Sequence, residues 1–479
     1  MTELCITVIG RDAEAIRHAR AAAEADADLV ELRLDSMARP DAAAALQGRT
    51  KPAIVTCRPI REGGLFAGAE EARLRVLADA DAQGAEFIDV EWDSVGAPVM
   101  AARRGRGVVV SRHVFDATPS NAAQLLDDLR GQGGEIAKLA VMSERIADLR
   151  TLLAAARPDR SSILIGMGAA GIATRVLAAR FGSRWTYAGN GMAPGQLPAS
   201  RLLEEFRFRR VDDAAAVYGV LGRPVGNSLS PAMHNAGFAA LGLNAAYVPI
   251  ETRDLDGLRE FASEIGLRGL SVTIPFKQEV LSMLDDLTPA ARTAGAVNTI
   301  AIRDGRWLGS NTDADGFLEP LRAGGIVLHG LRVVILGAGG SARAVGLALV
   351  GEGARVGIAA RRPGAAADVA RATGATPVPW PPPAGSWDLL VNTTPVGSRS
   401  VAGIPYEGPL DGHLVYDLIY DPDPTELMRR ARDAGLEAIG GLAMLVAQAE
   451  RQFEVWTGQR PPAALFAGAA VSAIRTRAV

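Results

Sequence analysis

Short apolar runs alternate with longer amphipathic stretches through the first part of the chain. Runs of this kind, bounded by turn residues, predict buried strands. The stretches between them have helical length and spacing, for example Asp12–Ala25, Glu70–Gln83, Asn121–Gly131 and Ile172–Phe181. The apolar runs are Leu4–Gly10, Asp28–Asp35, Ala53–Arg58, Phe87–Trp92, Gly107–Val114, Glu135–Met142, Ser162–Met167 and Trp185–Gly189.

Repeated β-α units of this kind over about 200 residues predict a (βα)8 barrel of the TIM type. An open, doubly wound sheet is the alternative. That fold usually has a glycine-rich phosphate turn after its first strand, and this chain has none there.

Polar side chains interrupt the predicted strands. Glu31 and Arg33 stand two residues apart, so they share one face of their strand. Arg58 ends the third strand, His113 lies near the end of the fifth, and Lys138 lies within the sixth. Polar residues at the carboxyl ends of barrel strands indicate an active site. Taken singly, a mutual ion pair or a lysine reaching solvent is the simpler interpretation of each.

The residue types suggest a reaction. Burial of Lys138 in an apolar strand disfavours its ammonium form, and a neutral amine can form a Schiff base with a carbonyl. The iminium acidifies the neighbouring C–H bonds, and His113 can move the proton. Several arginines predict an anionic substrate, most simply a carboxylate. These residues therefore predict a Schiff-base lyase acting on a keto acid, either a dehydratase or an aldolase.

Six sequence blocks follow one another in a specific order in this segment. They are ELRLD (31–35), TCRPIREGG (56–64), SRHVFDATPS (111–120), EIAKLAVM (135–142), FGS (181–183) after Arg175, and APGQ (193–196). With these blocks, residues 1–208 resemble type I 3-dehydroquinate dehydratases.

The resemblance implies a role for each matching residue. Lys138 is then the Schiff-base lysine and His113 the general acid/base, which Glu62 positions. Three arginines surround the substrate carboxylate, and two residues contact its hydroxyls. The arginines are Arg33, Arg58 and Arg175, and the hydroxyl contacts are Glu31 and Gln196. One departure is Met192, which stands where the family usually offers a serine.

A second pattern begins with the apolar run Val333–Leu336, which leads into Gly337, Gly339 and Gly340 and then an alanine-rich stretch. Strand, glycine turn and helix start form the phosphate cradle of a dinucleotide-binding fold, although a plain glycine-rich turn is the alternative. The next predicted strand, Ala354–Ala360, is followed by Arg361 and Arg362 instead of an acidic residue. This exchange predicts NADP in preference to NAD.

Between the two patterns, Val211–Ala216 is the predicted linker, and a new strand starts at Val217. Ser228 and Ser230 precede a predicted helix, where capping is an alternative to ligand binding. The block SVTIPFK (271–277) predicts a strand followed by a lysine at a helix start, and NTDADG (311–316) brings an aspartate. Lys277 and Asp313 can transfer protons at an alcohol carbon, or form a structural ion pair. Beside a dinucleotide, they predict ketone–alcohol oxidoreduction.

Residues 217–479 resemble shikimate dehydrogenases. The matching blocks are GRPVGNSLSPAMHN, SVTIPFK, GAVNTI, NTDADGF, GAGGSAR, NTTPVG and GLAMLVAQA. The resemblance implies Lys277 and Asp313 as the catalytic pair. It implies that the substrate is held by Ser228, Ser230, Thr273, Asn298 and Gln448, with Tyr420 nearby. It implies that NADP is bound by Gly337, Gly339, Gly340 and Arg361, and Arg362 is additional to the family pattern. From its position after another predicted strand, the loop with Asn392 and Thr393 is expected to line the nicotinamide.

The predicted fold class is α/β, with a TIM barrel followed by a two-domain shikimate-dehydrogenase-like unit. The predicted domains are 1–211 (the barrel), 217–325 with the final helix 460–479 (substrate binding), and 326–459 (the NADP-binding Rossmann domain). The two implied reactions are consecutive, from 3-dehydroquinate to 3-dehydroshikimate and then to shikimate, and fused versions of this order exist. The alternatives are a Schiff-base aldolase fused to a quinate dehydrogenase, and a metabolite sensor without catalysis.

Composition narrows the choice of partners. The net charge is only −3 and charged residues make up 22% of the chain, which argues against a nucleic-acid or membrane-surface partner. Cys5 and Cys57 lie in apolar runs, as reduced core thiols of a cytoplasmic protein do. No targeting segment, membrane span or metal site is predicted, and we expect a monomer or small homo-oligomer with small-molecule substrates.

Overall fold

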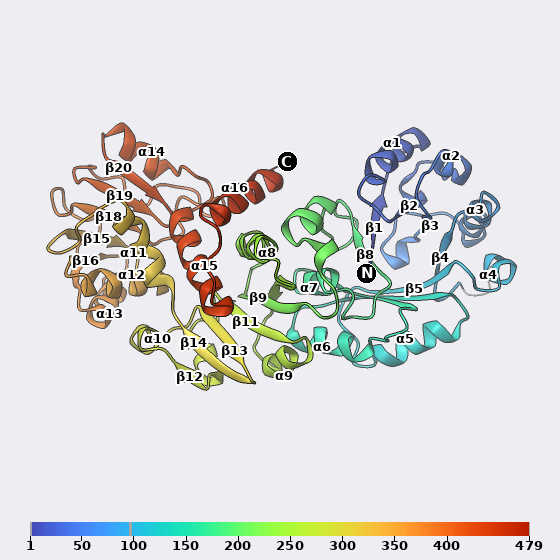
Figure 1. Ribbon diagram of the computed structural model, residues 1–479. Helices are drawn as coiled ribbons and strands as arrows, with labels where there is room; N and C mark the ends of the chain where they lie inside the picture. The colour runs from blue at the N-terminus through green and yellow to red at the C-terminus, as the bar shows by residue number, and fades with distance from the viewer. Residues whose placement is uncertain (1, 95–97, 479) are drawn as a thin grey trace. The chain divides into compact units, whose positions relative to one another are not determined.

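The computed structural model describes residues 2–94 and 98–478, and the chain divides into two compact units (Figure 1). The first unit contains Met1–Arg268 and Arg475–Val479, and the second contains Gly269–Ile474. The boundary falls within strand β11 (Leu267–Val272). The units are described one at a time.

Eight parallel strands form the sheet of the barrel, in the order β7-β6-β5-β4-β3-β2-β1-β8. All eight strands predicted from the apolar runs are confirmed, within a few residues at their ends. The strands are β1 (Glu3–Val8), β2 (Leu29–Arg33), β3 (Ala53–Thr56), β4 (Phe87–Glu91), β5 (Val108–Val114), β6 (Ile136–Met142), β7 (Ser162–Met167) and β8 (Trp185–Ala188).

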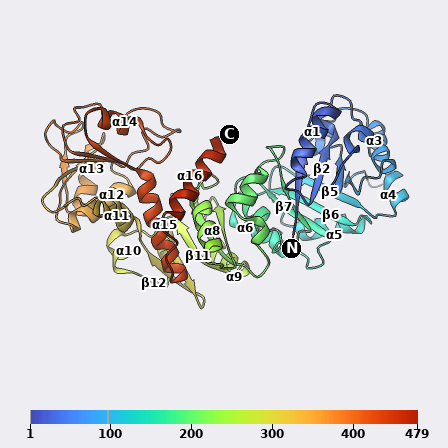
Figure 2. The ribbon, with the colours of Figure 1, turned by 45° about the horizontal axis from the view of Figure 1, so that its top comes forward.

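Helices of the barrel lie outside its strands, as Figure 2 shows for α1, α3 and α4. The helix α7 ends at Val176, five residues before its predicted end at Phe181, because the chain turns there. The Leu177 carbonyl accepts the amides of Arg180 and Phe181, and Gly182 has a φ of 65°. The helices are α1 (Ala13–Ala23), α2 (Ala42–Leu46), α3 (Glu70–Ala82), α4 (Pro98–Arg103), α5 (Ala122–Gly131), α6 (Ile146–Ala155) and α7 (Ile172–Val176).

Alternation along the strands divides the barrel interior into two layers. The lower layer is apolar and includes Cys5, Leu29, Ile54, Val109, Ile136, Ile163 and Trp185. Two residues further along each strand, the next inward-facing side chain lies closer to the carboxyl end, because successive side chains alternate between faces. There the residues are mostly polar: Thr7, Glu31, Thr56, Asp89, Ser111, Lys138, Ile165 and Tyr187. The sequence thus builds an apolar base under a polar site.

The seam between β7 and β8 is the place where the barrel closes. An isolated parallel bridge joins Ser162, the first residue of β7, to Ser183, two residues before β8. The Ser183 hydroxyl accepts the Leu164 amide at 3.0 Å, and the Arg184 amide donates to the Ser162 carbonyl at 3.0 Å. Because Ser183 and Leu164 are both buried, a side chain replaces part of the strand ladder here.

The rest of the first unit contains the parallel pair β9 (Ala216–Gly222) and β10 (Ala245–Glu251). Their helices are α8 (Ser230–Ala240) and α9 (Leu258–Glu264). In the second unit, β13 (Thr299–Arg303) pairs antiparallel with β11 and with β14 (Arg306–Ser310), and β12 (Asp286–Leu287) pairs parallel with β14. The short helix α10 (Pro289–Ala294) lies in this region.

A second parallel sheet forms the rest of the second unit, in the order β17-β16-β15-β18-β19-β20. This order, with the first strand central and the third and sixth at the edges, is that of the dinucleotide-binding fold. The strands are β15 (Arg332–Leu336), β16 (Arg355–Ala359), β17 (Thr376–Val378), β18 (Leu389–Asn392), β19 (Leu414–Asp417) and β20 (Glu437–Gly440). The helices are α11 (Asp313–Ala323), α12 (Gly340–Gly351), α13 (Pro363–Thr373), α14 (Glu426–Asp433), α15 (Gly441–Thr457) and α16 (Leu465–Ala478).

Helices cover both faces of this sheet. Residues of one register, such as Val333 and Ile335, pack against α11, α12 and α13. Residues of the other register, such as Val334 and Leu336, pack with Trp387 and helix α14. Continuous apolar runs are needed for strands that are buried on both faces, which is why β15 is apolar from Val333 to Leu336. No helix of the described chain is long and apolar enough to cross a membrane.

The seam generates a stability prediction. Ser183→Ala removes the acceptor of the buried Leu164 amide and should lower the free energy of unfolding by about 1–3 kcal/mol. Urea denaturation of the full chain, followed by the fluorescence of the barrel tryptophans, measures this change. Ser161→Ala is the matched control, because its hydroxyl bonds to exposed Asp159 at 2.9 Å; its effect should stay within about 0.5 kcal/mol. Equal effects of the two variants would contradict the role assigned to Ser183.

Candidate active sites

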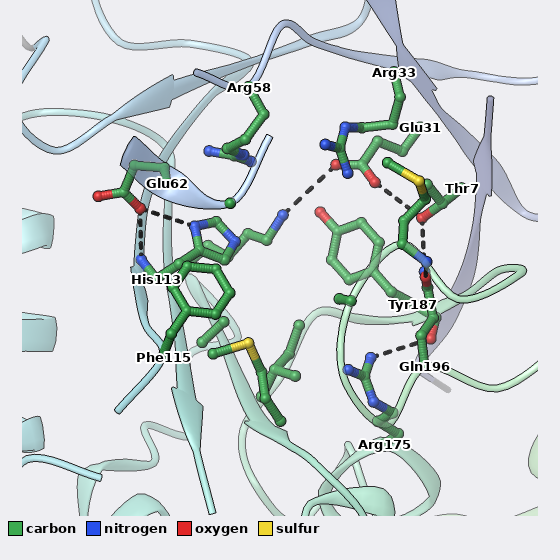
Figure 3. A pocket seen from close by; sticks show the side chains of 17 residues that line it. Thr7, Glu31, Arg33, Arg58, Glu62, His113, Phe115, Arg175, Tyr187 and Gln196 are labelled. Carbon is green, nitrogen blue, oxygen red and sulfur yellow. Dashed lines mark hydrogen bonds and ion pairs between the residues drawn. The ribbon is translucent and has the colours of Figure 1, made fainter. Parts of the chain in front are cut away.

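A pocket with an empty volume of about 560 Å³ opens at the carboxyl end of the barrel (Figure 3). The alternation described above directs side chains of several strands into it, and the loops after β3 and β8 complete its wall. The structure brings together all eight residues that the sequence predicted for this site: Glu31, Arg33, Arg58, Glu62, His113, Lys138, Arg175 and Gln196. They come from positions far apart in the chain, as a barrel site requires.

Lys138 lies at the base of the pocket and is only 5% exposed. Its Nζ is 3.2 Å from Asp89 Oδ2 and 3.6 Å from Glu31 Oε1, and it stands 4.3 Å from the centre of the Tyr187 ring. Burial alone disfavours the ammonium form of Lys138, whereas these two carboxylates attract it. Lys138 points into the pocket and therefore can reach a ligand carbonyl.

Asp89 and Glu91 are site residues that sequence reasoning missed. Both are fully buried on β4, where Arg58 donates to Asp89 and to Glu91 at 2.8 Å each, and Ser111 donates to Asp89 at 2.5 Å. Burial raises the pKa of Asp89, but the charges of Arg58 and Lys138 outweigh it, so the pKa is far below its usual value. Two carboxylates at i and i+2 in the apolar run FIDVEW were the available signal.

His113 is held by Glu62. Glu62 Oε2 accepts the His113 backbone amide at 2.8 Å and lies 3.1 Å from its Nδ1. Burial, and then the positive charge of Arg58, lowers the pKa of His113 to about 4. Burial works against ionisation of Glu62 too, but its hydrogen bonds with His113 outweigh that effect and lower the pKa of Glu62. The imidazole is therefore neutral near pH 7, with Nε2 the ring nitrogen that Glu62 does not contact.

The three predicted arginines differ in their partners. Arg33 pairs with Asp35 at 2.7 Å, and Arg58 pairs with Asp89 and Glu91. Arg175 forms no ion pair with a described carboxylate and has only the long contacts to backbone carbonyls at 3.4 Å. Burial lowers the pKa of Arg175 to about 10, so it is still charged near pH 7. Arg175 is therefore the cation of the pocket that is best placed to take an anionic ligand.

The loop after β8 covers one side of the pocket. Gln196 Nε2 donates to Thr7 Oγ1 at 3.1 Å, and Thr7 in turn donates to Glu31 Oε2 at 2.9 Å. The Met192 amide donates to Gln196 Oε1 at 3.0 Å, and its side chain lines the pocket where the resemblance led us to expect a serine. A thioether replaces a hydroxyl at this place, so the wall here is apolar.

In the second unit, Lys277 and Asp313 form a close ion pair. Lys277 Nζ lies 2.5 Å from Asp313 Oδ2, and both side chains are partly exposed. Asn298 Nδ2 donates to Asp313 Oδ1 at 2.7 Å. Asp313 is the first residue of α11, and its amide donates to Asn311 Oδ1 at 2.9 Å. Three of the predicted site residues are thus in direct contact.

The sequence predicted Lys277 at the start of a helix, and this prediction is wrong. It lies in a turn after β11, two residues before a 3₁₀ helix at Glu279–Met283. The strand already ends at Val272, so half-buried Thr273 begins this turn and accepts the Phe276 amide at 2.9 Å. The hydrogen bond from Leu281 N to Gln278 O spans three residues, which is why the following turn is tighter than an α-helix.

Gln448 is brought close to Asp313 by helix packing. A Cβ at Gly316 would come within 2.6 Å of Gln448 Cβ, so only glycine permits α11 and α15 to approach this closely. Thr312 Oγ1 donates to the Gln448 carbonyl at 3.3 Å, while Gln448 Nε2 donates to the Leu445 carbonyl at 2.9 Å. Tyr420 is half-buried three residues after β19.

Ser228 and Ser230 belong to the first unit. Ser230 is buried at the start of α8, and its amide donates to Ser228 Oγ at 3.2 Å. The N-cap residue of α8 is Leu229, and no side chain caps this helix, so the capping alternative is wrong for both serines. The Ser228 O–H group is not used in this contact and can donate to another acceptor.

The glycine turn after β15 has the geometry of a phosphate cradle. Gly337 has a φ of 111°, and a Cβ there would come within 2.6 Å of Thr393 Oγ1. A Cβ on Gly339 or Gly340 would meet no atom within 4 Å, and no side chain caps the start of α12. The first amides of a helix have no partner within it, so this open space faces free N–H donors. The residues present therefore fit a dinucleotide pyrophosphate.

The other predicted cofactor residues stand at the same edge of the sheet. Arg361 and Arg362 are exposed directly after β16, the strand beside β15. Asn392 donates to Asp417 Oδ1 at 2.8 Å, and Thr393 donates to the Leu336 carbonyl at 2.7 Å. Thr393 thus fixes the loop after β18 to the last residue before the glycine turn, and Asn392 fixes it to the end of β19. Among the described residues, no group of His, Cys, Asp and Glu side chains could hold a metal ion.

Family models match both parts of the chain. The model for type I 3-dehydroquinase matches residues 4–213. The model for the shikimate dehydrogenase substrate binding domain matches residues 220–300, and the one for the shikimate 5′-dehydrogenase C-terminal domain matches residues 441–470. The first match contains the barrel pocket, the second contains Lys277 and the third contains Gln448. The glycine turn at 337–340 lies outside the matched ranges.

Single relatives agree with the models. The shikimate dehydrogenase (NADP(+)) of Carboxydothermus hydrogenoformans is 36% identical over 275 residues, covering 53% of this chain and 95% of the relative. The crystal structure of shikimate 5-dehydrogenase from Thermus thermophilus in complex with NADP(H) and shikimate is similar with a TM-score of 0.50. It is 40% identical and covers 54% of this chain and 99% of that chain.

A relative with both parts spans nearly the whole chain. The chloroplastic bifunctional 3-dehydroquinate dehydratase/shikimate dehydrogenase of Arabidopsis thaliana is 33% identical over 483 residues, covering 92% of this chain and 80% of the relative. In this chain the dehydratase match comes before the shikimate dehydrogenase match. The chain belongs to the family of bifunctional 3-dehydroquinate dehydratase/shikimate dehydrogenases.

Proposed function

We propose that the barrel dehydrates 3-dehydroquinate to 3-dehydroshikimate and that the second active site reduces 3-dehydroshikimate to shikimate with NADPH. The observation that supports this most directly is the buried Lys138, whose Nζ lies in a pocket with neutral His113 and with Arg175, which has no carboxylate partner among the described residues. The family supplies the two activities, and the geometry assigns them to residues.

In the barrel, Arg175 binds the substrate carboxylate, because its charge is not compensated within the described protein. The Lys138 amine adds to the substrate ketone, water leaves, and an iminium forms. Neutral His113 then takes the proton from the carbon next to the iminium carbon, and the electron pair moves into the enamine. His113 returns the proton to the departing hydroxyl as water is lost. Hydrolysis of the iminium releases the enone and restores Lys138.

Two carboxyl-bearing groups organise these steps. Glu62 holds His113 through both its backbone and Nδ1, which leaves Nε2 for the proton transfer. Glu31, fixed by the hydroxyls of Thr7 and Thr56, and Gln196 provide acceptors and donors for the substrate hydroxyls.

In the second active site, Lys277 and Asp313 hold and move the proton at the substrate oxygen, with Asn298 fixing the carboxylate. Thr273, Gln448, Tyr420, Ser228 and Ser230 are the proposed contacts of the ring substituents. When bound, NADPH supplies the hydride. Gly337, Gly339 and Gly340 give its pyrophosphate close access to the start of α12, and Arg361 with Arg362 bind the 2′-phosphate.

We place the protein in the cytoplasm, as a monomer or small homo-oligomer. Both cysteines are buried free thiols, which suits a reducing compartment. Cell fractionation and sedimentation of the purified chain test these two points.

The two activities should separate by mutation. With 3-dehydroquinate and NADPH, the full chain should oxidise NADPH and form shikimate. Lys138→Ala should abolish this reaction but still reduce added 3-dehydroshikimate, because the two sites use different residues. Lys277→Ala is the reciprocal control: it should keep dehydration and lose reduction. Absorbance of NADPH and product chromatography follow both steps.

The same assay separates the alternatives. Carbon–carbon cleavage products from 3-dehydroquinate would identify an aldolase. Faster oxidation of quinate than of shikimate would identify a quinate dehydrogenase. Tight NADP binding without any turnover would favour a sensor and overturn the proposal.

In the pH profile of kcat/KM for dehydration, the fall on the acid side (the acid limb) should lie at unusually low pH. Because burial and Arg58 lower the pKa of His113 to about 4, the base stays neutral above that pH and becomes protonated as pH falls through it. We therefore expect kcat/KM, which reports the free enzyme, to remain high at about pH 5 and to decline near the pKa of His113. Reductase activity after return to neutral pH verifies that the fold survives. Glu62→Gln removes a charge that raises the pKa, so its limb should shift to still lower pH. A limb near the ordinary histidine pKa of about 6.5 in both proteins would contradict the assignment.

Arg361 should determine the choice of cofactor. Arg361→Ala removes a charged hydrogen bond to the 2′-phosphate, worth about 1–3 kcal/mol. The ratio of the KM for NADP to the KM for NAD should therefore rise by the factor that corresponds to this free energy. Arg371→Ala is the matched control, since Arg371 is exposed on α13 and pairs with Asp368. Steady-state kinetics with both cofactors measures the ratio. An unchanged ratio in the Arg361 variant would remove this residue from cofactor selection.

A further inference from the structure

Tyr187 is a buried residue of the barrel pocket that has no role in the reaction steps given above. It lies on β8 and is 3% exposed, with Lys138 Nζ 4.3 Å from its ring centre. In Figure 3, the ring of Tyr187 and the imidazole of His113 lie on opposite sides of the pocket. The aromatic face is thus presented to the amine that we assign to Schiff-base formation.

The ring is held in this orientation from below. Trp185 contacts Tyr187 edge-on, with centroids 6.5 Å apart, and Phe87 contacts Trp185 at 5.2 Å. Edge-to-face contacts are favourable for aromatic rings, and Trp185 is fully buried. The row of three rings forms part of the apolar base of the barrel, so the Tyr187 ring cannot easily turn away from Lys138.

The ring supplies an interaction that does not depend on the N–H groups of the lysine. The ammonium group of Lys138 has three N–H donors for Asp89 and Glu31. After it loses one proton, the amine lone pair adds to the ketone carbon, and the carbonyl oxygen leaves as water as the nitrogen loses a second proton. The iminium nitrogen then retains one N–H, and the positive charge spreads over nitrogen and carbon. Two of the three donors to the carboxylates are therefore gone, whereas attraction to an aromatic face needs no N–H and acts on the whole planar cation.

We propose that Tyr187 is a catalytic residue of the dehydration, whose ring face stabilises the Lys138 iminium and shields one side of it from water. This inference rests on the proposed Schiff-base function. The substrate then lies on the side toward His113, where its proton is removed. Burial raises the pKa of Tyr187 well above its usual value, so the phenol stays protonated and the ring stays neutral.

Fluorinated phenylalanines at position 187 test the ring face directly. Each added fluorine weakens the negative face of the ring with little change in shape. In the full chain, Tyr187→Phe should stay within about twofold of the natural protein, and successive fluorination should lower both kcat for dehydration and the fraction of Lys138 trapped by borohydride. The total loss at three fluorines should be about tenfold, in line with a desolvated cation–aromatic contact.

Two controls accompany the series. The same analogues at Phe87, which belongs to the row of rings but does not contact Lys138, should leave dehydration unchanged. Reduction of 3-dehydroshikimate by each variant reports that the chain is folded.

Each other outcome overturns a specific part of the inference. Loss of activity in Tyr187→Phe would assign the role to the hydroxyl. No trend with fluorination, together with a loss in Tyr187→Leu, would show that the ring only fills space. Absence of borohydride trapping at Lys138 in the natural protein, with dehydration intact, would overturn the Schiff-base function itself.

Discussion

Burial of charge inside the barrel is the constraint on which the first active site depends. An ionised side chain removed from water needs a partner of opposite charge or a set of hydrogen bonds. Here strand alternation supplies the partners: Asp89 lies between Arg58 and Lys138, and Ser111 completes its hydrogen bonds. The layer below is apolar and buried, so on that side these pairs hold the lysine against side chains that cannot compete for hydrogen bonds.

In the second active site, the charged side chains are stabilised in a different way. Lys277 and Asp313 lie on a turn and a helix start and are partly exposed, so solvent shares in stabilising their charges. Helix packing and a hydrogen bond fix the positions of the two side chains. Gly316 lets α11 approach α15, and Asn298 holds Asp313 through a 2.7 Å hydrogen bond. Dehydration needs a buried amine next to a neutral base, whereas reduction needs an accessible proton donor beside a cofactor, and the two sites differ accordingly.

The sequence predicted much of the fold because both folds have strong local patterns. All eight barrel strands and the strands around the glycine turn were found from apolar runs, since fully buried parallel strands are continuous in sequence. The early end of α7 and the turn at Lys277 were predicted wrongly, because helical spacing continues past residues where tertiary contacts stop the helix. Seam closure through Ser183 has no local signal, because it depends on two strands meeting across the barrel.

The candidate residues lie together in one pocket, but their pairing was not predicted. The strand pattern placed Lys138, His113, Arg33 and Arg58 at one end of the barrel, and the resemblance added Arg175, yet neither showed which charges neutralise each other. Asp89 and Glu91 were not predicted as site residues, because acidic residues at alternate positions of a strand are also typical of a face exposed to solvent.

Pairing decides what each arginine can do. Arg33 and Arg58 carry charges that the protein already satisfies, so they shape and polarise the pocket, whereas buried Arg175 has no such partner among the described residues. An anion that enters the pocket recovers the cost of burying Arg175. The same anion gains less from Arg33 and Arg58, because it competes there with fixed carboxylates. Substrate affinity should therefore reside mainly in one guanidinium, even though three line the pocket.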